Sequence, residues 1–365
     1  MIEEINEIKE IELFSNEWLD LLMQDSDIDI CFLYPEWFNC WWQSFGGKKQ
    51  KLSILLWYTA KLSGVFPLFT FNDYYKGIPY RRLSFLENPN SPVVDFIVKT
   101  KDKIFAIPEL ISFLFHKKDW DIFILNKIDK DNVSFSILKK FLKSNKIPFF
   151  IRLIHNSPYI EISKSWDEFW KETSQRFKKR IRNNFNRLFK AGNIKFEEVN
   201  NILGNDLPLR QAFQVSSNSW KAKLGTAMNS SPQRQTFFTN LSKIASQKGW
   251  LSIWLLKIDD VPAAMEYHLK HRGVTYAMRG DYDENYKKFS PGACLEAYII
   301  QECFKKELKR YDFCGLDYDY KLHWTHKSKA KMRFIIYNKT PRGFLLYHIH
   351  KLNFRIKKIK NKKWK

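Results

Sequence analysis

The sequence lacks the features that mark a disulfide-bonded or membrane-spanning protein. Its five cysteines are odd in number and form no C-x-x-C pair, which is typical of reduced thiols. No apolar run approaches the roughly 18 residues that cross a bilayer, and the first residues are acidic where a signal peptide is basic. We therefore expect a cytoplasmic protein whose cysteines are mostly buried core residues.

Common catalytic motifs are also absent. The sequence contains no P-loop, G-x-S-x-G, H-E-x-x-H or dinucleotide-binding glycine motif, which argues against NTPase, serine hydrolase, zinc protease and dehydrogenase chemistry. The pairs His323/His326 and His348/His350 have no acidic or thiol partners at ligand spacing, so we expect no metal site.

Negative charge is scarce relative to positive charge. Sixty-one Lys and Arg against 39 Asp and Glu give a net charge of +22, which attracts anions over a long range. Nucleic acid, an anionic membrane surface, an acidic carrier protein and a phosphate-rich cofactor all fit. The tail 351–365 holds eight of the basic residues with apolar residues between them. It is either a frayed, solvated end or a contact with the inner membrane face, to which each basic residue would contribute about 1 kcal/mol.

The first half of the chain predicts a mixed α/β unit. Hydrophobic residues make up 44% of the sequence, enough for globular packing. Ile8 to Leu13 reads as a strand, and Pro35 opens an aromatic-rich helix that ends at the glycine pair 46–47. Residues 52–58 and 64–71 form a pair of strands joined by a polar turn.

The second half begins with a capped helix. Ser165 and Glu168 have the spacing of a capping box, and the helix that follows should break near Ser174. Apolar residues recur at steps of three and four, while the other side is basic: Arg176, Lys178, Lys179, Arg180, Arg182, Arg187 and Lys190. This basic side is either an ordinary solvated face or a contact for donor phosphates or an acidic carrier.

Three strands follow as a meander over 251–257, 262–270 and 274–279. Laying Leu251-Ser252-Ile253 over Leu52-Ser53-Ile54 also aligns the strands that come next. We interpret this as an internal repeat of about 200 residues, and hence as a duplicated fold.

A second capped helix follows the meander. Ser290 is placed as its N-cap, Pro291 as its first residue, and the free N–H groups of Gly292 and Ala293 would favour a pyrophosphate. We assign Arg279, at the end of the preceding strand, and Lys288, in the connecting loop, to the same phosphate site.

The most unusual stretch of the chain runs from Tyr311 to Trp324. It starts as a short strand, breaks at Gly315, and then gathers polar and aromatic residues more densely than an ordinary turn does. It resembles the Y-D-F-x-x-G-D-x-x-Y-K-x-x-W signature of the acetyltransferase-like domain of CelD-type proteins of bacterial cellulose and exopolysaccharide biosynthesis, within the GNAT superfamily. The matching residues are Tyr311, Asp312, Phe313, Asp317, Tyr320, Lys321 and Trp324. Leu316 stands where that signature has glycine.

The resemblance implies transfer of an acyl group from acyl-CoA or an acyl carrier protein to an amine of a small molecule or polysaccharide precursor. Such chemistry needs a base, for which Asp317, oriented by Lys321, is one candidate. Glu266 is the other, because a carboxylate inside a strand is desolvated. Tyr320 would protonate the departing thiolate, and the acceptor site would be lined by Trp220, His323 and Trp324.

Together these features predict a duplicated GNAT-like fold of mixed α/β class, with two mixed sheets flanked by helices. We place an N-terminal half at 1–160, a C-terminal half with the signature at 161–350 and a basic tail at 351–365. Duplicated GNAT-like domains also occur in Fem peptidyltransferases, so an alternative activity is amino-acid transfer from aminoacyl-tRNA. A non-catalytic scaffold in polysaccharide synthesis is the third possibility.

Overall fold

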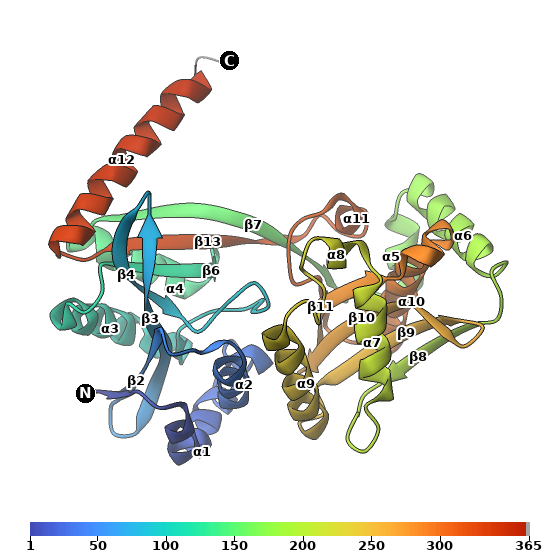
Figure 1. Cartoon of the computed structure of the whole chain (residues 1–365), viewed down its shortest axis with the longest axis horizontal. Coiled ribbons are helices and arrows are strands. Elements are labelled where there is room, and N and C mark those ends of the chain that lie inside the picture. The colour runs from blue at the N-terminus through green and yellow to red at the C-terminus, as the bar shows by residue number, and fades with distance from the viewer. Residues whose placement is uncertain (363–365) are drawn as a thin grey trace. The chain divides into compact units, whose positions relative to one another are not determined.

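The computed structural model describes residues 1–362 and divides into two compact units (Figure 1). Unit 1 comprises Met1–Trp42, Gly46–Ile154 and the chain from Ala330 on, and unit 2 comprises Gln43–Phe45 and His155–Lys329. Strand β7 (Phe149–Glu161) starts in unit 1 and ends in unit 2.

Unit 1 is a mixed sheet with helices. Its strand order is β1, β2, β3, β4, β6, β13 and the first part of β7, with β5 beside β3. The neighbours β4 and β6 run parallel, whereas β1–β2, β2–β3, β3–β4 and β6–β13 are antiparallel. The elements are β1 (Ile2–Ile5), α1 (Ile11–Met23), α2 (Pro35–Phe45), β2 (Gln50–Tyr58), β3 (Leu62–Tyr75), β4 (Ile78–Phe85), β5 (Ile97–Val98), α3 (Lys103–Lys117), β6 (Ile122–Asp129), α4 (Val133–Ser144), β13 (Ser328–Tyr337) and α12 (Pro341–Lys362).

A large hydrophobic cluster of unit 1 lies between this sheet and helices α3 and α4. Helix α3 buries Ala106, Ile107, Leu110, Ile111 and Leu114, at the three- and four-residue steps of one helix face. They join buried apolar residues of β2, β3, β4, β6 and β13 in a single cluster. Burial of this face therefore holds α3 on the sheet.

A buried ion pair fixes the start of α3. The Lys103 ammonium lies 2.6 Å from the Asp95 carboxylate, and the two side chains are only 1% and 7% exposed. Lys103→Ala leaves that carboxylate buried without its cation, so we expect a loss of about 3–5 kcal/mol in the free energy of unfolding. Chemical denaturation measures it, with the exposed Lys101→Ala as control. A loss below about 1 kcal/mol, the range of exposed pairs, would contradict this prediction.

Unit 2 repeats the same arrangement. Its strand order is β8, β9, β10, β11, β12 and the last part of β7, and β11–β12 is the parallel pair. The elements are α5 (Trp166–Glu172), α6 (Gln175–Leu188), β8 (Ile194–Val199), α7 (Leu207–Ser217), α8 (Trp220–Lys223), α9 (Pro232–Gln247), β9 (Leu251–Ile258), β10 (Val261–His271), β11 (Val274–Tyr282), the 3₁₀ helix η4 (Glu284–Phe289), α10 (Pro291–Lys305), β12 (Arg310–Asp312) and α11 (Asp319–Leu322).

The repeat extends to individual contacts. In unit 1, Ser53 on β2 donates to Glu4 on β1 over 2.6 Å, and Lys117 at the end of α3 pairs with the same carboxylate. In unit 2, Ser252 on β9 donates to Glu198 on β8 over 2.8 Å, and Lys306, just after α10, pairs with that carboxylate. The alignment of Ser53 with Ser252 therefore coincides with equivalent positions in the two units.

The mixed α/β fold flanked by helices is confirmed, including the strands expected at 52–58, 64–71 and across the meander. The two expected sheets are instead continuous, because β7 pairs with β13 and with β12 and so joins all strands in one 13-stranded sheet. The strand predicted at Ile8–Leu13 is wrong, because Ile8–Glu10 is a 3₁₀ turn and α1 starts at Ile11. The buried residues of α1 explain this, since Phe14, Trp18, Leu21 and Leu22 recur at helical steps.

The compact units also differ from the expected halves at their C-terminal boundary. The chain returns to unit 1 at Ala330 because β13 pairs with β6 through the sheet of that unit. The tail predicted at 351–365 continues α12 as far as Lys362. Residues 363–365 lie outside the described residues, as do the side chains from Phe354 on. Among the helices of the described part, none is long and apolar enough to cross a membrane.

Candidate active site

The polar centre of unit 2 is a cluster of buried side chains around Glu266. This residue sits in β10, opposite Gly280 of β11 and Trp254 of β9, and only 7% of it is exposed. Its carboxylate accepts a hydrogen bond from His268 Nε2 at 2.6 Å and one from the Tyr311 hydroxyl at 3.1 Å. Sequence reasoning found Glu266, but not His268 or the role of Tyr311 as its partner.

A second carboxylate, Glu296 of α10, shares this centre. Its Oε2 accepts the indole N–H of Trp324 at 3.0 Å, and the residue is half-buried. Burial, and then repulsion by the charge of Glu266, raises the pKa of Glu296 to about 8. A carboxyl group that titrates near neutral pH can exchange a proton with an amine, as a general base must.

The same positions in unit 1 are apolar. In unit 2, His268 of β10 is paired with Ser252 of β9, and Glu266 is paired with Trp254, two residues further along β9. The corresponding partners of Ser53 and Leu55 in unit 1 are Leu68 and Phe66, both fully buried in the hydrophobic core. Unit 1 therefore keeps the fold without the polar cluster, which places the candidate site in unit 2.

The strands of unit 2 leave an open edge beside this cluster. Strand β12 pairs only with Val274–Tyr276, whereas β11 continues to Tyr282. From Ala277 on, β11 has β10 on one side and no strand on the other in the described part of the chain. This stretch of β11 is therefore a strand edge, the kind of backbone with which an extended ligand can pair, although the Gly280 carbonyl already accepts Lys221 Nζ at 2.6 Å.

The signature stretch, Tyr311 to Trp324, forms a loop and a short helix after β12. Cys314 takes a left-handed conformation (φ 48°) just before Gly315, and α11 follows. Lys321 is buried, with its ammonium 3.1 Å from the carbonyl of Phe313, and burial lowers its pKa. Lys321 therefore anchors the loop, and no ion pair joins it to Asp317 among the described residues.

Asp317 has the opposite character to Glu296. Its carboxylate accepts a hydrogen bond from Asn156 Nδ2 at 3.1 Å, and this bond is the main cause that lowers its pKa. A lowered pKa makes a carboxylate a weaker base. Of the carboxylates in unit 2 with a shifted pKa, Glu296 therefore suits proton abstraction better than Asp317 does.

Tyr320 fits the role of a proton donor. The residue is 49% exposed, yet burial around its hydroxyl, and then the charges of Glu296 and Glu266, raise its pKa. The hydroxyl therefore stays protonated at physiological pH. It lies within electrostatic reach of both carboxylates and remains accessible to a ligand.

The start of α10 adjoins a basic side chain. Ser290 is at the N-cap with a left-handed backbone (φ 53°), but its hydroxyl forms no capping bond to the helix and instead accepts Arg187 of α6 at 3.3 Å. Ser290 is therefore the N-cap residue, as predicted, but the side-chain capping bond expected of it is not formed. The N–H groups of Gly292 and Ala293 belong to the first turn, where a helix has no internal partners for them.

The other predicted phosphate ligands are less well placed. The guanidinium of Arg279 donates to the Thr226 carbonyl at 2.5 Å and lies 3.7 Å from the Asp281 carboxylate, so its charge is already compensated. Lys288 is exposed on η4, with its ammonium 4.8 Å from the centre of the Phe289 ring. Lys288 is therefore free to turn toward an anion, whereas Arg279 serves mainly to hold its own loop.

The predicted acceptor residues fall into two groups. Trp324 is 5% exposed and packs edge-on against Phe177, so it supports Glu296 from within the core. Trp220 is 42% exposed at the start of α8, and the adjacent Lys221 donates to the carbonyl of Gly280 at 2.6 Å. This bond sets Trp220 beside the open part of β11. His323 is exposed and shares a hydrogen bond of 3.1 Å with Arg180 of α6.

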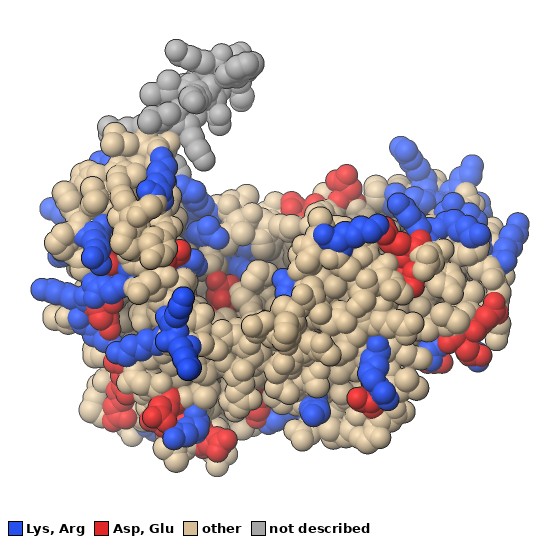
Figure 2. Space-filling view, viewed as in Figure 1, with Lys and Arg blue, Asp and Glu red and all other residues tan. Residues whose placement is uncertain are grey.

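Basic residues gather on the outer face of α6, which lies in the upper right of the space-filling view (Figure 2). The helix buries Phe177, Ile181, Asn184 and Leu188. Its exposed cations are Arg176, Lys179, Arg180, Arg182 and Arg187. Because Arg187 reaches Ser290 and Arg180 reaches His323, this face borders both the start of α10 and the signature stretch.

The cysteines and the possible metal ligands of the described residues provide no candidate nucleophile or metal centre. Cys31, Cys40, Cys294 and Cys303 are buried, and burial raises the pKa of both Cys294 and Cys303 to about 12, which makes them poor nucleophiles. No group of three His, Cys, Asp or Glu side chains suited to a metal ion occurs in the described part of the chain.

Comparison with known protein families relates part of unit 2 to one domain family. Residues 175–322 match the acetyltransferase (GNAT) domain family. The match covers less than half of the chain and includes Glu266, Glu296, the start of α10 and most of the signature stretch. Unit 2 thus has a GNAT-type fold. The comparison with curated proteins gave no match.

Solved structures extend the likeness to both units. FemX superposes with a TM-score of 0.60 at 11% identity, over 91% of this chain and 96% of its own. A conserved protein of unknown function from Bacteroides thetaiotaomicron gives 0.55 at 9% identity, over 93% and 100%. The C-terminal domain of a protein assigned as a lysylphosphatidylglycerol synthetase from Agrobacterium fabrum gives 0.54 at 10% identity, over 93% and 95%. At these identities the likeness concerns the fold.

Proposed function

We propose that the protein is an N-acyltransferase that moves an acyl group from an acyl thioester, acyl-CoA or an acyl carrier protein, to an amine. The observation that carries this proposal is the pair Glu266 and Glu296, in which one carboxyl group has its pKa raised to about 8 beside an open strand edge. The family match over 175–322 supports the reaction class. The signature resemblance favours an amino sugar or another surface-polysaccharide precursor as the acceptor.

The proposed chemistry assigns one task to each group. Ionised Glu296 takes a proton from the acceptor ammonium, and the resulting amine attacks the thioester carbonyl. A C–N bond forms, the C–S bond breaks, and Tyr320 gives its proton to the departing thiolate. The attacking nitrogen then loses its second proton to the Tyr320 oxygen, which leaves the amide and restores the hydroxyl, and Glu296 releases its own proton to solvent. Tyr311 and His268 hold Glu266 in place by the two hydrogen bonds to its carboxylate. Glu266 itself acts on Glu296 through its charge.

The donor would occupy the open edge and the start of α10. Its extended chain could pair with the backbone of β11 beyond Tyr276, and its phosphates would meet the N–H groups of Gly292 and Ala293. Arg187 and Lys288 supply positive charge at the same end of the helix. A carrier protein would replace the nucleotide part of CoA and contact the basic face of α6.

A second candidate, amino-acid transfer from aminoacyl-tRNA, is favoured by one observation, the cationic face of α6 along the site. The overall likeness to FemX supports it at the level of the fold. A polyanion bound there would lose affinity steeply with salt, because each phosphate contact releases counterions. An acyl-CoA, which makes few phosphate contacts, would show a much weaker dependence.

Release of free thiol tests the proposal. The full chain is mixed with acetyl-CoA or a longer acyl-CoA and a panel of amino sugars and other small amines, and thiol is followed with a colorimetric reagent. We expect release that depends on both the amine and the enzyme. Charged aminoacyl-tRNA is tested in parallel for loss of its amino acid to the same amines. Amine-dependent turnover of tRNA alone would replace the first candidate by the second.

The rate should depend on pH in the direction set by Glu296. Only the ionised carboxylate accepts a proton, so kcat/KM should rise with pH and level off above about 8. The acceptor amine produces a similar rise, and an acceptor with a lower amine pKa separates the two. A profile that is flat between about pH 6 and 9, or that falls across this range, would exclude Glu296 as the base.

A further inference from the structure

The C-terminal helix α12 presents an unusual apolar surface to solvent. Phe344, Leu345 and Leu352 are 63%, 47% and 58% exposed. The opposite side of the helix is anchored on unit 1, since Leu346 is fully buried and His350 is hydrogen-bonded to the Tyr337 hydroxyl. Because these contacts hold one side of α12 against unit 1, Phe344, Leu345 and Leu352 on the other side remain exposed to solvent.

The C-terminal part of the sequence carries charge of one sign. The last acidic residue of the chain is Asp319, and residues 320–365 contain fifteen Lys or Arg. Seven of them belong to α12. A helix with exposed large apolar residues and only positive charge is therefore attached to a unit whose fold does not use that face.

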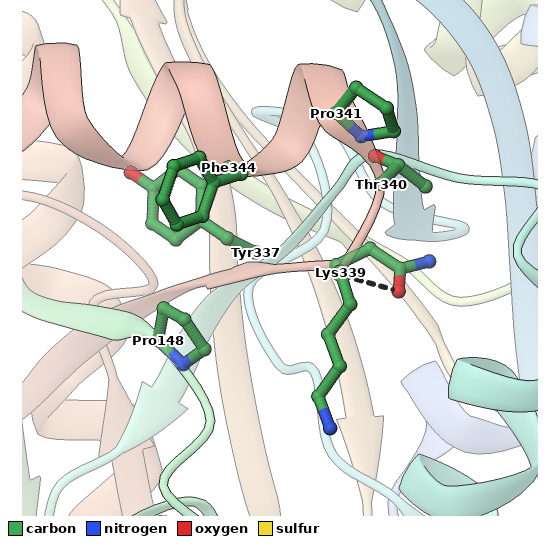
Figure 3. A pocket seen from close by; sticks show the side chains of 7 residues that line it. Pro148, Tyr337, Lys339, Thr340, Pro341 and Phe344 are labelled. Atoms are coloured by element: carbon green, nitrogen blue, oxygen red, sulfur yellow. Dashed lines mark hydrogen bonds between the residues drawn. The ribbon is translucent and has the colours of Figure 1, made fainter.

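The apolar surface continues beyond the helix into a cavity. Phe344 at the start of α12, Tyr337 at the end of β13, and Pro148 line a hollow of about 330 Å³ in unit 1 (Figure 3). Thr340 and Pro341, the first residue of α12, form another side, and the side chain of Lys339 extends away from the aromatic rings. The cavity lies entirely within unit 1 and contains none of the residues of the candidate active site.

We propose that α12 binds an anionic lipid surface, with Phe344, Leu345 and Leu352 at the level of the headgroups and with the positive charge of this part of the sequence providing the attraction to the lipid phosphates. Amphipathic helices with basic residues and exposed Leu or Phe bind membranes in this way. Charge alone would suit nucleic acid equally well. The exposed leucines decide between the two, because a leucine gains free energy on entering lipid and gains none from a phosphate backbone.

Flotation with lipid vesicles tests this inference and needs no acyl donor, so its result is independent of the proposed activity. The full chain should float with vesicles of phosphatidylcholine and phosphatidylglycerol and remain unbound with phosphatidylcholine alone. Bound protein should be released by high salt. Absence of binding to the anionic vesicles, or equal binding to both kinds, would overturn the proposal.

Two sets of variants assign the binding to α12. Lys357→Gln, Lys358→Gln and Lys360→Gln together should lower the partition coefficient about a hundredfold, since each basic residue contributes about fivefold (about 1 kcal/mol). The control removes three exposed lysines of unit 1 elsewhere, Lys140, Lys143 and Lys146. Equal effects of the two triple variants would show a non-specific attraction and overturn the proposal.

The apolar set is Phe344→Gln, Leu345→Gln and Leu352→Gln, which should lower partitioning at least tenfold. Its control is Ile104→Gln with Phe105→Gln, two residues of α3 that are 58% and 63% exposed. Circular dichroism confirms that each variant is folded. Unchanged lipid binding of the α12 set, together with salt-sensitive retention of RNA that its lysines control, would assign α12 to nucleic acid instead.

Discussion

Replacing Glu296 by Gln should lower the rate of acyl transfer by about 10²–10⁴-fold, the usual contribution of a general base. The amide keeps the size of the side chain and can still accept the indole N–H of Trp324. It cannot take a proton from the acceptor. The effect should therefore fall on kcat, with little change in donor binding, and is measured by thiol release at saturating donor.

The matched control is Glu302→Gln on the same helix, where the carboxylate pairs with Lys305 at 2.7 Å and touches neither Glu266 nor Trp324. It should keep near-normal activity.

A second readout is the free energy of unfolding of the natural chain and of Glu296→Gln. Burial raises the pKa of Glu296 from its usual 4.5 to about 8. The folded protein therefore loses stability as the pH rises from about 4.5 through about 8. Glu296→Gln should lack that loss. If Glu296→Gln kept half of the normal rate of acyl transfer, Glu296 would be excluded as the base.

Gly292→Pro should weaken binding of acyl-CoA by about 10–150-fold, the range expected when a hydrogen bond to a charged group is lost. Proline is accepted in the first turn of a helix, where it removes the backbone N–H that we assign to a donor phosphate and adds a ring beside Tyr282. Calorimetric titration with acetyl-CoA gives the dissociation constant.

Gly292→Ala separates this effect from crowding. The added methyl group would lie 3.2 Å from Tyr282 Cδ1, so alanine tests the steric change while the N–H remains. We expect alanine to bind acyl-CoA within a few-fold of the natural chain. Equal losses for alanine and proline would show that the position matters through packing, and would contradict the phosphate assignment.

The sequence predicted the fold well where local patterns are strong. The strand pairs of both units follow apolar runs with turn residues between them, and the buried face of α6 follows the helical period. The alignment of Leu52-Ser53-Ile54 with Leu251-Ser252-Ile253 also located the repeat. The return of the chain to unit 1 through β13 was not predicted, because pairing between β6 and β13 joins segments about 200 residues apart and leaves no local pattern.

The candidate site was predicted only in part for a similar reason. Glu266 attracted notice as a charge within an apolar strand, whereas Glu296 is one charge in a helix that also carries Glu302 and Lys305. Its raised pKa arises from burial and from Glu266, which lies 30 residues earlier.

The most direct test of the central claim is a titration of the natural chain with acetyl-CoA, with aminoacyl-tRNA in parallel, at low and high salt. We predict saturable binding of acetyl-CoA that survives high salt and that Gly292→Pro weakens. Failure of acetyl-CoA and longer acyl-CoA to bind, with tight tRNA binding that high salt abolishes, would contradict the assignment of an acyl-CoA donor.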